Sequence, residues 1–173
     1  MDYVRSLGPL VLAHRFRRLM ESLLQAGDAV YAAHGLPFRA RWTSTLHLLD
    51  REGTLPVTEI AARLRLTHPA IIGIAEEMRA AGLLEFVRDD GDGRRRLVAL
   101  TPGARRLLPR FRRIWQALAT AQQRRFRRAG CDIVAVLDAV DDGLAETDLA
   151  SEVLGAAAPP RNARAGRRAA AVS

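Results

Sequence analysis

The stretch from Pro56 to Pro102 decides the fold and reads PVTEIAARLRLTHPAIIGIAEEMRAAGLLEFVRDDGDGRRRLVALTP. Apolar residues recur at helical spacing over 57–64 and again over 67–81, with only a short turn between the two segments. Thr67 is a typical N-cap for the second segment, and Gly82 is a typical helix stop. The spacing therefore predicts a helix–turn–helix.

A β-hairpin is predicted directly after this motif. Residues 83–87 and 96–100 are short apolar runs typical of strands, and the polar segment 88–94 between them contains two glycines. That segment is too long for a tight two-residue turn, so we expect the two strands to form a projecting wing. The predicted fold class is mainly α, a winged helix-turn-helix with a three-helix core and a β-hairpin wing.

Further amphipathic helices are expected on both sides of this core, at about 10–30, 39–52, 102–128 and 133–144. The apolar residues of the third helix are spaced 4-3-4-3, which is typical of a seam between two helices. A single small core cannot bury all of these stripes, so we expect N- and C-terminal helices to form a dimerisation region. The predicted organisation is an N-terminal dimerisation helix (1–36), a winged helix DNA-binding domain (37–101), C-terminal dimerisation helices (102–154) and a disordered basic tail (155–173).

The composition excludes several classes of protein. Hydrophobic residues make up 49% of the 173, which is too many for a wholly disordered chain. Cys131 is the single cysteine, which excludes a disulfide scaffold. No stretch approaches the roughly 18 apolar residues of a membrane span, and the N-terminus has no signal-peptide apolar region. We therefore expect a cytoplasmic protein without a membrane partner.

The basic charge is unevenly distributed. All 27 basic residues are arginine, against 19 acidic residues, and the net charge is +8. The net charge is +2 over 1–102, +9 over 103–130, −7 over 131–154 and +4 over 155–173. A polyanionic partner is compatible with this excess, but most of the excess lies outside the helix–turn–helix.

The second helix of such a motif enters the major groove of duplex DNA. Its first turn offers backbone N–H groups to phosphate, and small residues allow close approach to base edges. The candidate DNA-binding residues on and before this helix are Arg63, Arg65, Thr67, His68, Pro69, Ala70, Ile72 and Gly73. On the wing, Arg94, Arg95 and Arg96 are candidates for a narrow minor groove, and Asp92 is expected to hold the Arg94 guanidinium.

These residues resemble the MarR family of winged-helix transcriptional regulators over about 10–150. The resemblance rests on four segments: Ile60–Leu66, Met78-Arg79-Ala80-Ala81-Gly82-Leu83-Leu84, Asp92-Gly93-Arg94 and Leu100-Thr101-Pro102-Gly103. It implies a homodimer that binds pseudo-palindromic double-stranded DNA, and many members also bind small aromatic or phenolic effectors. Ile72-Gly73 departs from the family pattern, which often has a hydroxyl residue and an arginine there, and Gly93 replaces a common basic residue.

In the family the effector cleft lies between the dimerisation helices and the DNA-binding lobe. The resemblance therefore makes six residues candidates for effector binding: His14, Arg17, Phe38, Trp42, His47 and Trp115. The alternative is that the aromatic residues belong to the core, which is the usual role of aromatic side chains at helical spacing. Cys131 is expected to be a packed or surface residue rather than a redox sensor.

The sequence contains no phosphate-binding loop, nucleophile–base pair or metal-ligand spacing, so neither an enzyme, a cofactor nor a metal site is expected. We expect a sequence-specific transcriptional regulator, most simply a dimeric repressor released by a small effector. Two alternatives stay open: a non-specific nucleoid-type DNA-binding protein, and a protein-interaction module on a winged-helix scaffold.

Overall fold

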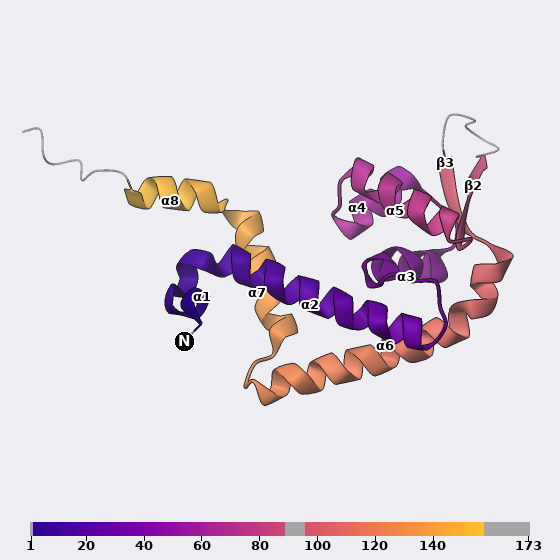
Figure 1. Cartoon of the computed structure of the whole chain (residues 1–173). Helices are drawn as coiled ribbons and strands as arrows, with labels where there is room; N and C mark the ends of the chain where they lie inside the picture. Colours follow the sequence, from indigo (N-terminus) through magenta and orange to yellow (C-terminus); the bar gives the residue numbers. More distant parts are fainter. Residues whose placement is uncertain (1, 89–95, 158–173) are drawn as a thin grey trace, which may run out of the picture. The chain divides into compact units, whose positions relative to one another are not determined.

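The computed structural model describes residues 2–88 and 96–157. The chain divides into two compact units, residues 1–120 and 121–173, which are described separately. The winged domain lies in the first unit and is drawn in purple to salmon in Figure 1. Its elements are α3 (Thr43–Glu52), β1 (Leu55–Pro56), α4 (Val57–Leu64), α5 (His68–Ala80), β2 (Leu84–Arg88) and β3 (Arg96–Leu100). The predicted winged-helix fold class is confirmed.

The helix–turn–helix is held by a buried row of side chains on α5 that packs with α4. Ile71, Ala75 and Met78 of α5, spaced four and three residues apart, are fully buried, and so is Ile60 of α4. The α5 helix ends where predicted, because Gly82 adopts a φ of 73° and the N–H of Leu83 returns to the Met78 carbonyl at 2.9 Å. The local sequence therefore fixes both the start and the end of the second motif helix.

The sheet has three strands in the order β1-β3-β2, all antiparallel. Leu84 of β2 pairs with Leu100 of β3, and Leu55 of β1 pairs with Val98 on the other side. The hairpin strands were predicted, whereas β1 was not. Two residues are too short to show a periodicity, and their strand character comes from pairing with β3, about forty residues later.

Long helices precede and follow the winged domain in the sequence. The N-terminal segment begins with α1 (Tyr3–Ser6) and the 3-10 helix η1 (Gly8–Val11), and continues as α2 (Leu12–Ala33). A second 3-10 helix, η2 (Ala40–Trp42), leads into α3, and α6 (Pro102–Arg128) follows β3. The boundaries of α6 match the prediction, because the Thr101 hydroxyl accepts the Ala104 N–H at 3.0 Å and caps the helix.

An aromatic cluster joins these helices to the winged domain. Phe38 lies 4.6 Å from Tyr31, 5.5 Å from Trp42 and 4.7 Å from Phe111, measured between ring centroids. The Tyr31 hydroxyl accepts the Trp115 indole N–H at 3.2 Å and lies 3.1 Å from the Thr43 hydroxyl. Contacts of this kind fix α2, η2 and α6 around one apolar centre.

The second unit contains α7 (Ile133–Glu146) and α8 (Leu149–Ala157). Asp132 and Asp148 each accept N–H groups from the first turn of the helix that follows. The α8 helix corrects the predicted disordered tail, since residues 155–157 are helical; residues 158–173 lie outside the described part. The cap at Asp148 was the sequence signal for this helix. Within the described ranges no helix is long and apolar enough to cross a bilayer, and no cluster of His, Cys, Asp and Glu is arranged to hold a metal.

A charged pair connects α3 to α6. Arg112 donates to both oxygens of Asp50, at 2.9 and 2.7 Å, and only 4% of the Asp50 side chain is exposed. Because the Arg112 guanidinium binds the charged form, the pKa of Asp50 lies below its ordinary value. A carboxyl with a lowered pKa contributes stability at neutral pH, and that contribution is lost as the pH falls through the unfolded and then the folded pKa.

We expect Asp50→Asn to lower the free energy of unfolding by about 1 kcal/mol at pH 7, because one oxygen of the bidentate pair becomes an amide. The difference between this variant and the native chain should begin to shrink as the pH falls below about 4, where the Asp50 carboxyl of the unfolded chain takes up a proton, and should vanish below the lowered pKa of Asp50 in the folded chain. Urea denaturation at a series of pH values measures this. Asp138→Asn, on the exposed face of α7, is the control; a deficit for Asp50→Asn that is the same at all pH values would contradict the argument.

Candidate nucleic-acid interface

The first two turns of α5 are exposed on one side and firmly anchored on the other. Ile71, Ala75 and Met78 are fully buried, whereas His68, Pro69, Ala70 and Gly73 are exposed and Ile72 is 39% exposed. Among the described residues, nothing lies within 4 Å of the position that a Cβ of Gly73 would take. This half of α5 therefore presents a surface with little side-chain bulk, which suits close approach to a partner.

The N-terminus of α5 keeps the predicted cap. The Thr67 hydroxyl accepts the Ala70 N–H at 3.3 Å. In the first turn of α5, Pro69 has no backbone N–H, and the N–H of His68 donates to no acceptor among the described residues. A helix start with such donors favours an anion through both its N–H groups and its dipole.

The two arginines of the motif turn differ in what they contact. Arg63 donates to Glu59 at 2.7 Å and contacts Glu52 at 3.2 Å, and these carboxylates raise its pKa. Arg65 adopts a left-handed backbone, with a φ of 51°, and is exposed without an ion pair in the described part of the chain. Of the two candidates, Arg65 is the one whose charge is not matched by a carboxylate of the described residues.

A groove of about 330 Å³ runs between the exposed side of α5 and the base of the wing. Its lining includes His68 and Ile72 from α5 and Phe86 and Arg96 from the strands. The Arg96 guanidinium lies over the Phe86 ring, 5.6 Å from its centroid, which orients the side chain toward this groove. The structure thus brings His68, Ile72 and Arg96 together. The predicted wing residues Asp92, Arg94 and Arg95 lie outside the described residues.

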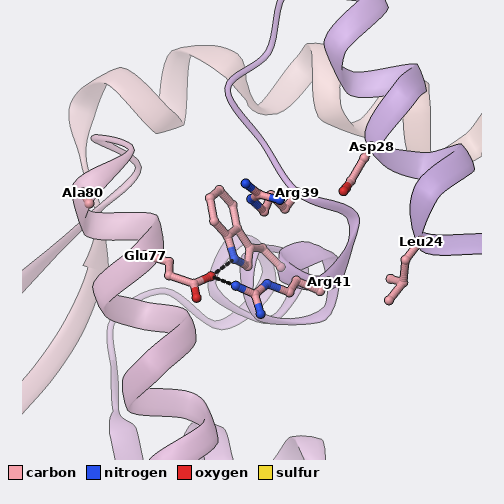
Figure 2. Close-up of a pocket in the computed structure, with 7 residues that line it drawn as sticks. Leu24, Asp28, Arg39, Arg41, Glu77 and Ala80 are labelled. Atoms are coloured by element: carbon pink, nitrogen blue, oxygen red, sulfur yellow. Dashed lines mark hydrogen bonds and ion pairs between the residues drawn. The ribbon is translucent and has the colours of Figure 1, made fainter. Parts of the chain in front are cut away.

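A second, larger cleft of about 650 Å³ lies against the other end of α5. Figure 2 shows Leu24 and Asp28 of α2 on one side, Glu77 and Ala80 of α5 on the other, and Arg39 and Arg41 between them. Trp42 completes the lining. The cleft is therefore shared by the N-terminal helix, the segment before α3 and the second motif helix.

Glu77 is the centre of the polar contacts in this cleft. Its Oε2 atom accepts the Trp42 indole N–H at 2.9 Å and a guanidinium N–H of Arg41 (Figure 2). These donors lower the pKa of Glu77, and the nearby charge of Arg39 acts in the same direction. The carboxylate thereby connects α5 to η2.

Of the six residues predicted to bind an effector, only Trp42 lines this cleft. Phe38 is 6% exposed and belongs to the aromatic cluster, and Trp115 is bonded to Tyr31 and lies 5.2 Å from the His47 ring. His14 and Arg17 are exposed on an earlier part of α2. Phe38 and Trp115 therefore pack in or against the core, as the alternative interpretation of the aromatic residues expects.

The remaining lining residues were not predicted as effector contacts. Arg41 and Glu77 are 36 positions apart in the sequence, and no local pattern joins them. The sequence signal that could have pointed to this cleft was the adjacent pair Arg41 and Trp42, a cation beside an aromatic residue directly before a helix.

Comparison with known proteins finds a family model and several solved structures that are similar to this chain. The sequence model of the MarR family matches residues 34–95, which confirms the resemblance over the winged domain. The PcaV transcriptional regulator of Streptomyces coelicolor, solved with its natural ligand, is 24% identical, with 82% of this chain and 94% of that chain covered and a TM-score of 0.61. No protein of curated function matches the sequence.

Two further structures have the same fold. BpsR of Bordetella bronchiseptica, described for regulation of its DNA binding by 6-hydroxynicotinic acid, is 20% identical, with 76% and 93% coverage and a TM-score of 0.60. CouR, a transcriptional repressor bound to a 23-mer DNA duplex, is 21% identical, with 79% and 96% coverage and a TM-score of 0.62. At these identities the likeness concerns the fold.

A close contact between α2 and η2 lies next to the larger cleft, whose lining includes Asp28, Arg39 and Arg41. A Cβ placed on Gly27 would lie 2.7 Å from the Cβ of Ala40, and the neighbouring Asp28 accepts the Ala40 N–H at 2.6 Å. Glycine at this position therefore allows α2 and η2 to approach within hydrogen-bonding distance.

We expect Gly27→Ala to lower the free energy of unfolding by about 1–3 kcal/mol, because the added methyl group forces α2 away from η2. Thermal and urea denaturation measure the change. Gly143→Ala in α7, where a Cβ meets open space, is the matched control and should be stabilised by about 0.5–1 kcal/mol. If both variants were stabilised equally, α2 and η2 would have room for the added methyl group, which would contradict the close approach of Gly27 to Ala40.

Proposed function

We propose that this chain, which carries a MarR-family winged domain at residues 34–95, is a cytoplasmic, homodimeric transcriptional regulator that binds duplex DNA. The observation that carries the proposal is the exposed, sterically open N-terminal half of α5, whose opposite side is anchored in the core. In the proposed dimer two such helices enter successive major grooves about 34 Å apart on a pseudo-palindromic operator. The simplest mode of regulation is repression, by occupying the operator.

The contacts we propose divide into two kinds. The first turn of α5, with Thr67 and His68, binds phosphate, and Arg65 and Arg96 add charge beside it. Ile72 contacts a thymine methyl group, which is the base contact available to an aliphatic side chain. Arg94 and Arg95 of the wing, with Asp92 supporting Arg94, extend the proposed contact to the minor groove.

A second candidate function is a non-specific, nucleoid-type DNA-binding protein. The observation that favours it is the pair Ile72-Gly73, which offers no bidentate donor to a base edge. A duplex from upstream of the gene and a random duplex, compared over several salt concentrations, distinguish the two functions. Preference for the upstream duplex supports the regulator, and equal affinities with a steep salt slope support the non-specific binder. A protein-interaction module would bind neither duplex, and Arg94→Ala would then change nothing.

We expect Gly73→Leu to weaken binding to the upstream duplex by at least about tenfold, since the new side chain holds α5 away from the base edges. The fold should tolerate the change, because the Cβ position meets open space. Fluorescence anisotropy measures the affinity, and the melting temperature reports on folding. Ala119→Leu, on the exposed side of α6, is the control. An unchanged affinity of Gly73→Leu would remove this half of α5 from the interface.

The proposed homodimer is supported by apolar side chains that the single chain leaves exposed. On α2, Phe16 is 49% exposed and Met20 is 54% exposed; on α7, Leu137 is 45% and Val140 46% exposed. Exposed apolar rows of this length are typical of surfaces that bind another protein. A second copy of the chain supplies the same rows and can bury them in a symmetric interface.

We expect Phe16→Glu and Leu137→Glu each to shift the native chain from dimer to monomer, because each places a charge in the proposed interface. Analytical ultracentrifugation measures the assembly state, with Gln25→Glu on the exposed side of α2 as the control. A native chain that sediments as a monomer would overturn the dimer, as would variants that stay dimeric.

A further inference from the structure

One arginine at the base of the wing is held by an aromatic ring. The Arg96 guanidinium carbon lies over the Phe86 ring, 5.6 Å from its centroid. Arg63, near the same end of α5, is held instead by the carboxylate of Glu59. A carboxylate orients an arginine and matches its charge, whereas a ring orients it through the negative face of its π-system and carries no counter-charge. The ring therefore leaves the positive charge of Arg96 available to a partner.

The register of the two wing strands brings this arginine and this ring together. Phe86 of β2 pairs with Val98 of β3, so Arg96 is its diagonal neighbour on the same face of the hairpin. Diagonal neighbours in an antiparallel pair are within reach of aromatic and long side chains. The residue directly opposite Arg96 is Arg88, whose like charge disfavours a side chain that points straight across. The pairing thus favours an Arg96 that leans toward Phe86.

The ring is itself fixed by the core. Phe86 packs against the core cluster, and its partner Val98 is fully buried. The next pair on this face, Leu84 and Leu100, is also buried. An arginine has many rotamers, and their loss on binding costs conformational entropy. A ring that is held in place lets Arg96 lose part of this freedom on folding, before any partner binds.

Both side chains line the groove of about 330 Å³ beside the exposed half of α5. The other described residues of its lining are uncharged or, in one case, a histidine: Pro56, Val57, Thr58, His68 and Ile72. Because none of these lining residues is acidic, the charge of Arg96 gives the groove a preference for anions.

We propose that Phe86 is a positioning residue, which holds Arg96 beside the groove so that its guanidinium binds a phosphate group of duplex DNA. This role rests on the proposed function, because it requires that the exposed half of α5 faces DNA. Phe86 acts through Arg96 and does not touch the phosphate. Since the phosphates are alike in every sequence, the contact strengthens binding without selecting a sequence.

A double-mutant cycle measures the coupling between the two residues. The native chain, Phe86→Leu, Arg96→Gln and the double variant are each titrated with the upstream duplex and with a random duplex by fluorescence anisotropy. We expect Phe86→Leu to weaken binding to both duplexes by about two- to fivefold for each protomer bound. In the Arg96→Gln background the same change should cost less than about twofold. Equal losses in the two backgrounds would overturn the role, because a change that merely disturbs the fold acts whichever residue stands at position 96.

Two matched variants separate the aromatic face from the bulk of the side chain. Phe86→Tyr keeps the face of the ring and should retain the native affinity within about twofold. Val87→Leu, on the opposite and exposed face of β2, is the control for a change in the strand and should also bind as the native chain does. Melting temperatures report on folding. A loss for Phe86→Tyr as large as that for Phe86→Leu would contradict the role of the ring.

The phosphate contact has a readout of its own in the salt dependence. We expect Arg96→Gln to reduce the slope of log K against log salt by about one for each protomer, with both duplexes. An unchanged slope, or an effect confined to the upstream duplex, would rule out the phosphate as the partner of Arg96.

The contact between the two side chains can be observed without DNA. Protons above the face of an aromatic ring are shielded, so the signal of the Arg96 Nε–H should lie upfield of its position in Phe86→Leu. A nitrogen-edited NMR spectrum of the arginine side chains measures this shift, and the signal is identified by its loss in Arg96→Gln. A signal that stays in place in Phe86→Leu would show that the ring does not hold the arginine.

The two proposals fail separately. If both duplexes bind equally well and the coupling is present, the regulator proposal fails and the role of Phe86 stands. If the upstream duplex is preferred and the two losses are additive, the regulator stands and the role of Phe86 fails. If the native chain binds neither duplex, both proposals fail, whatever the NMR shift shows.

Discussion

The burial of the Phe38 ring is the constraint on which the rest of the first unit depends. The ring lies between Tyr31 of α2, Trp42 of η2 and Phe111 of α6, so three segments from distant parts of the sequence meet at one side chain. Because these contacts set the position of η2, they also set the position of Arg41 and Trp42. The hydrogen bonds from Arg41 and Trp42 to Glu77 therefore connect α5 to a segment whose position is set by the core.

Surface charge alone is a poor guide to the interface. The basic segment 103–130 carries nine arginines, yet Arg112 is bonded to Asp50 and Arg110 donates to the His34 carbonyl at 2.5 Å. Near the motif, Arg63 is matched by Glu59. Among the described residues near α5, Arg65 and Arg96 are arginines that no described carboxylate pairs with. Shape and the helix N-terminus therefore contribute a larger share of the proposed recognition than the net charge of +8 suggests.

The sequence predicted those parts of the fold that are specified locally. The bounds of α4 and α6 agree with prediction, because caps and apolar spacing are encoded within a few residues of each helix end. The β1 strand and the three-residue extension of helix into the expected tail were missed. The first is created by pairing with β3, and the second follows from a cap at Asp148 that was overlooked.

For the same reason, the sequence predicted the exposed residues of α5 but not the larger cleft. The exposed residues of α5 follow from helical geometry once the buried stripe is known, and Ile72 and Gly73 lie where expected. The larger cleft depends on contacts between residues more than thirty positions apart, such as Trp42 with Glu77. Helical spacing indicated that Trp42 was apolar and inward-facing, but it carried no information on the partner of its indole N–H.

The α5 helix presents three different sides within 13 residues. Ile71, Ala75 and Met78 face the core, Ile72 and Gly73 are exposed, and Glu77 faces the larger cleft. At about 100° per residue, Ile72 and Glu77 point about 140° apart around the helix axis, so one ligand cannot contact both directly. A contact made at Glu77 therefore reaches the exposed side only through the helix itself.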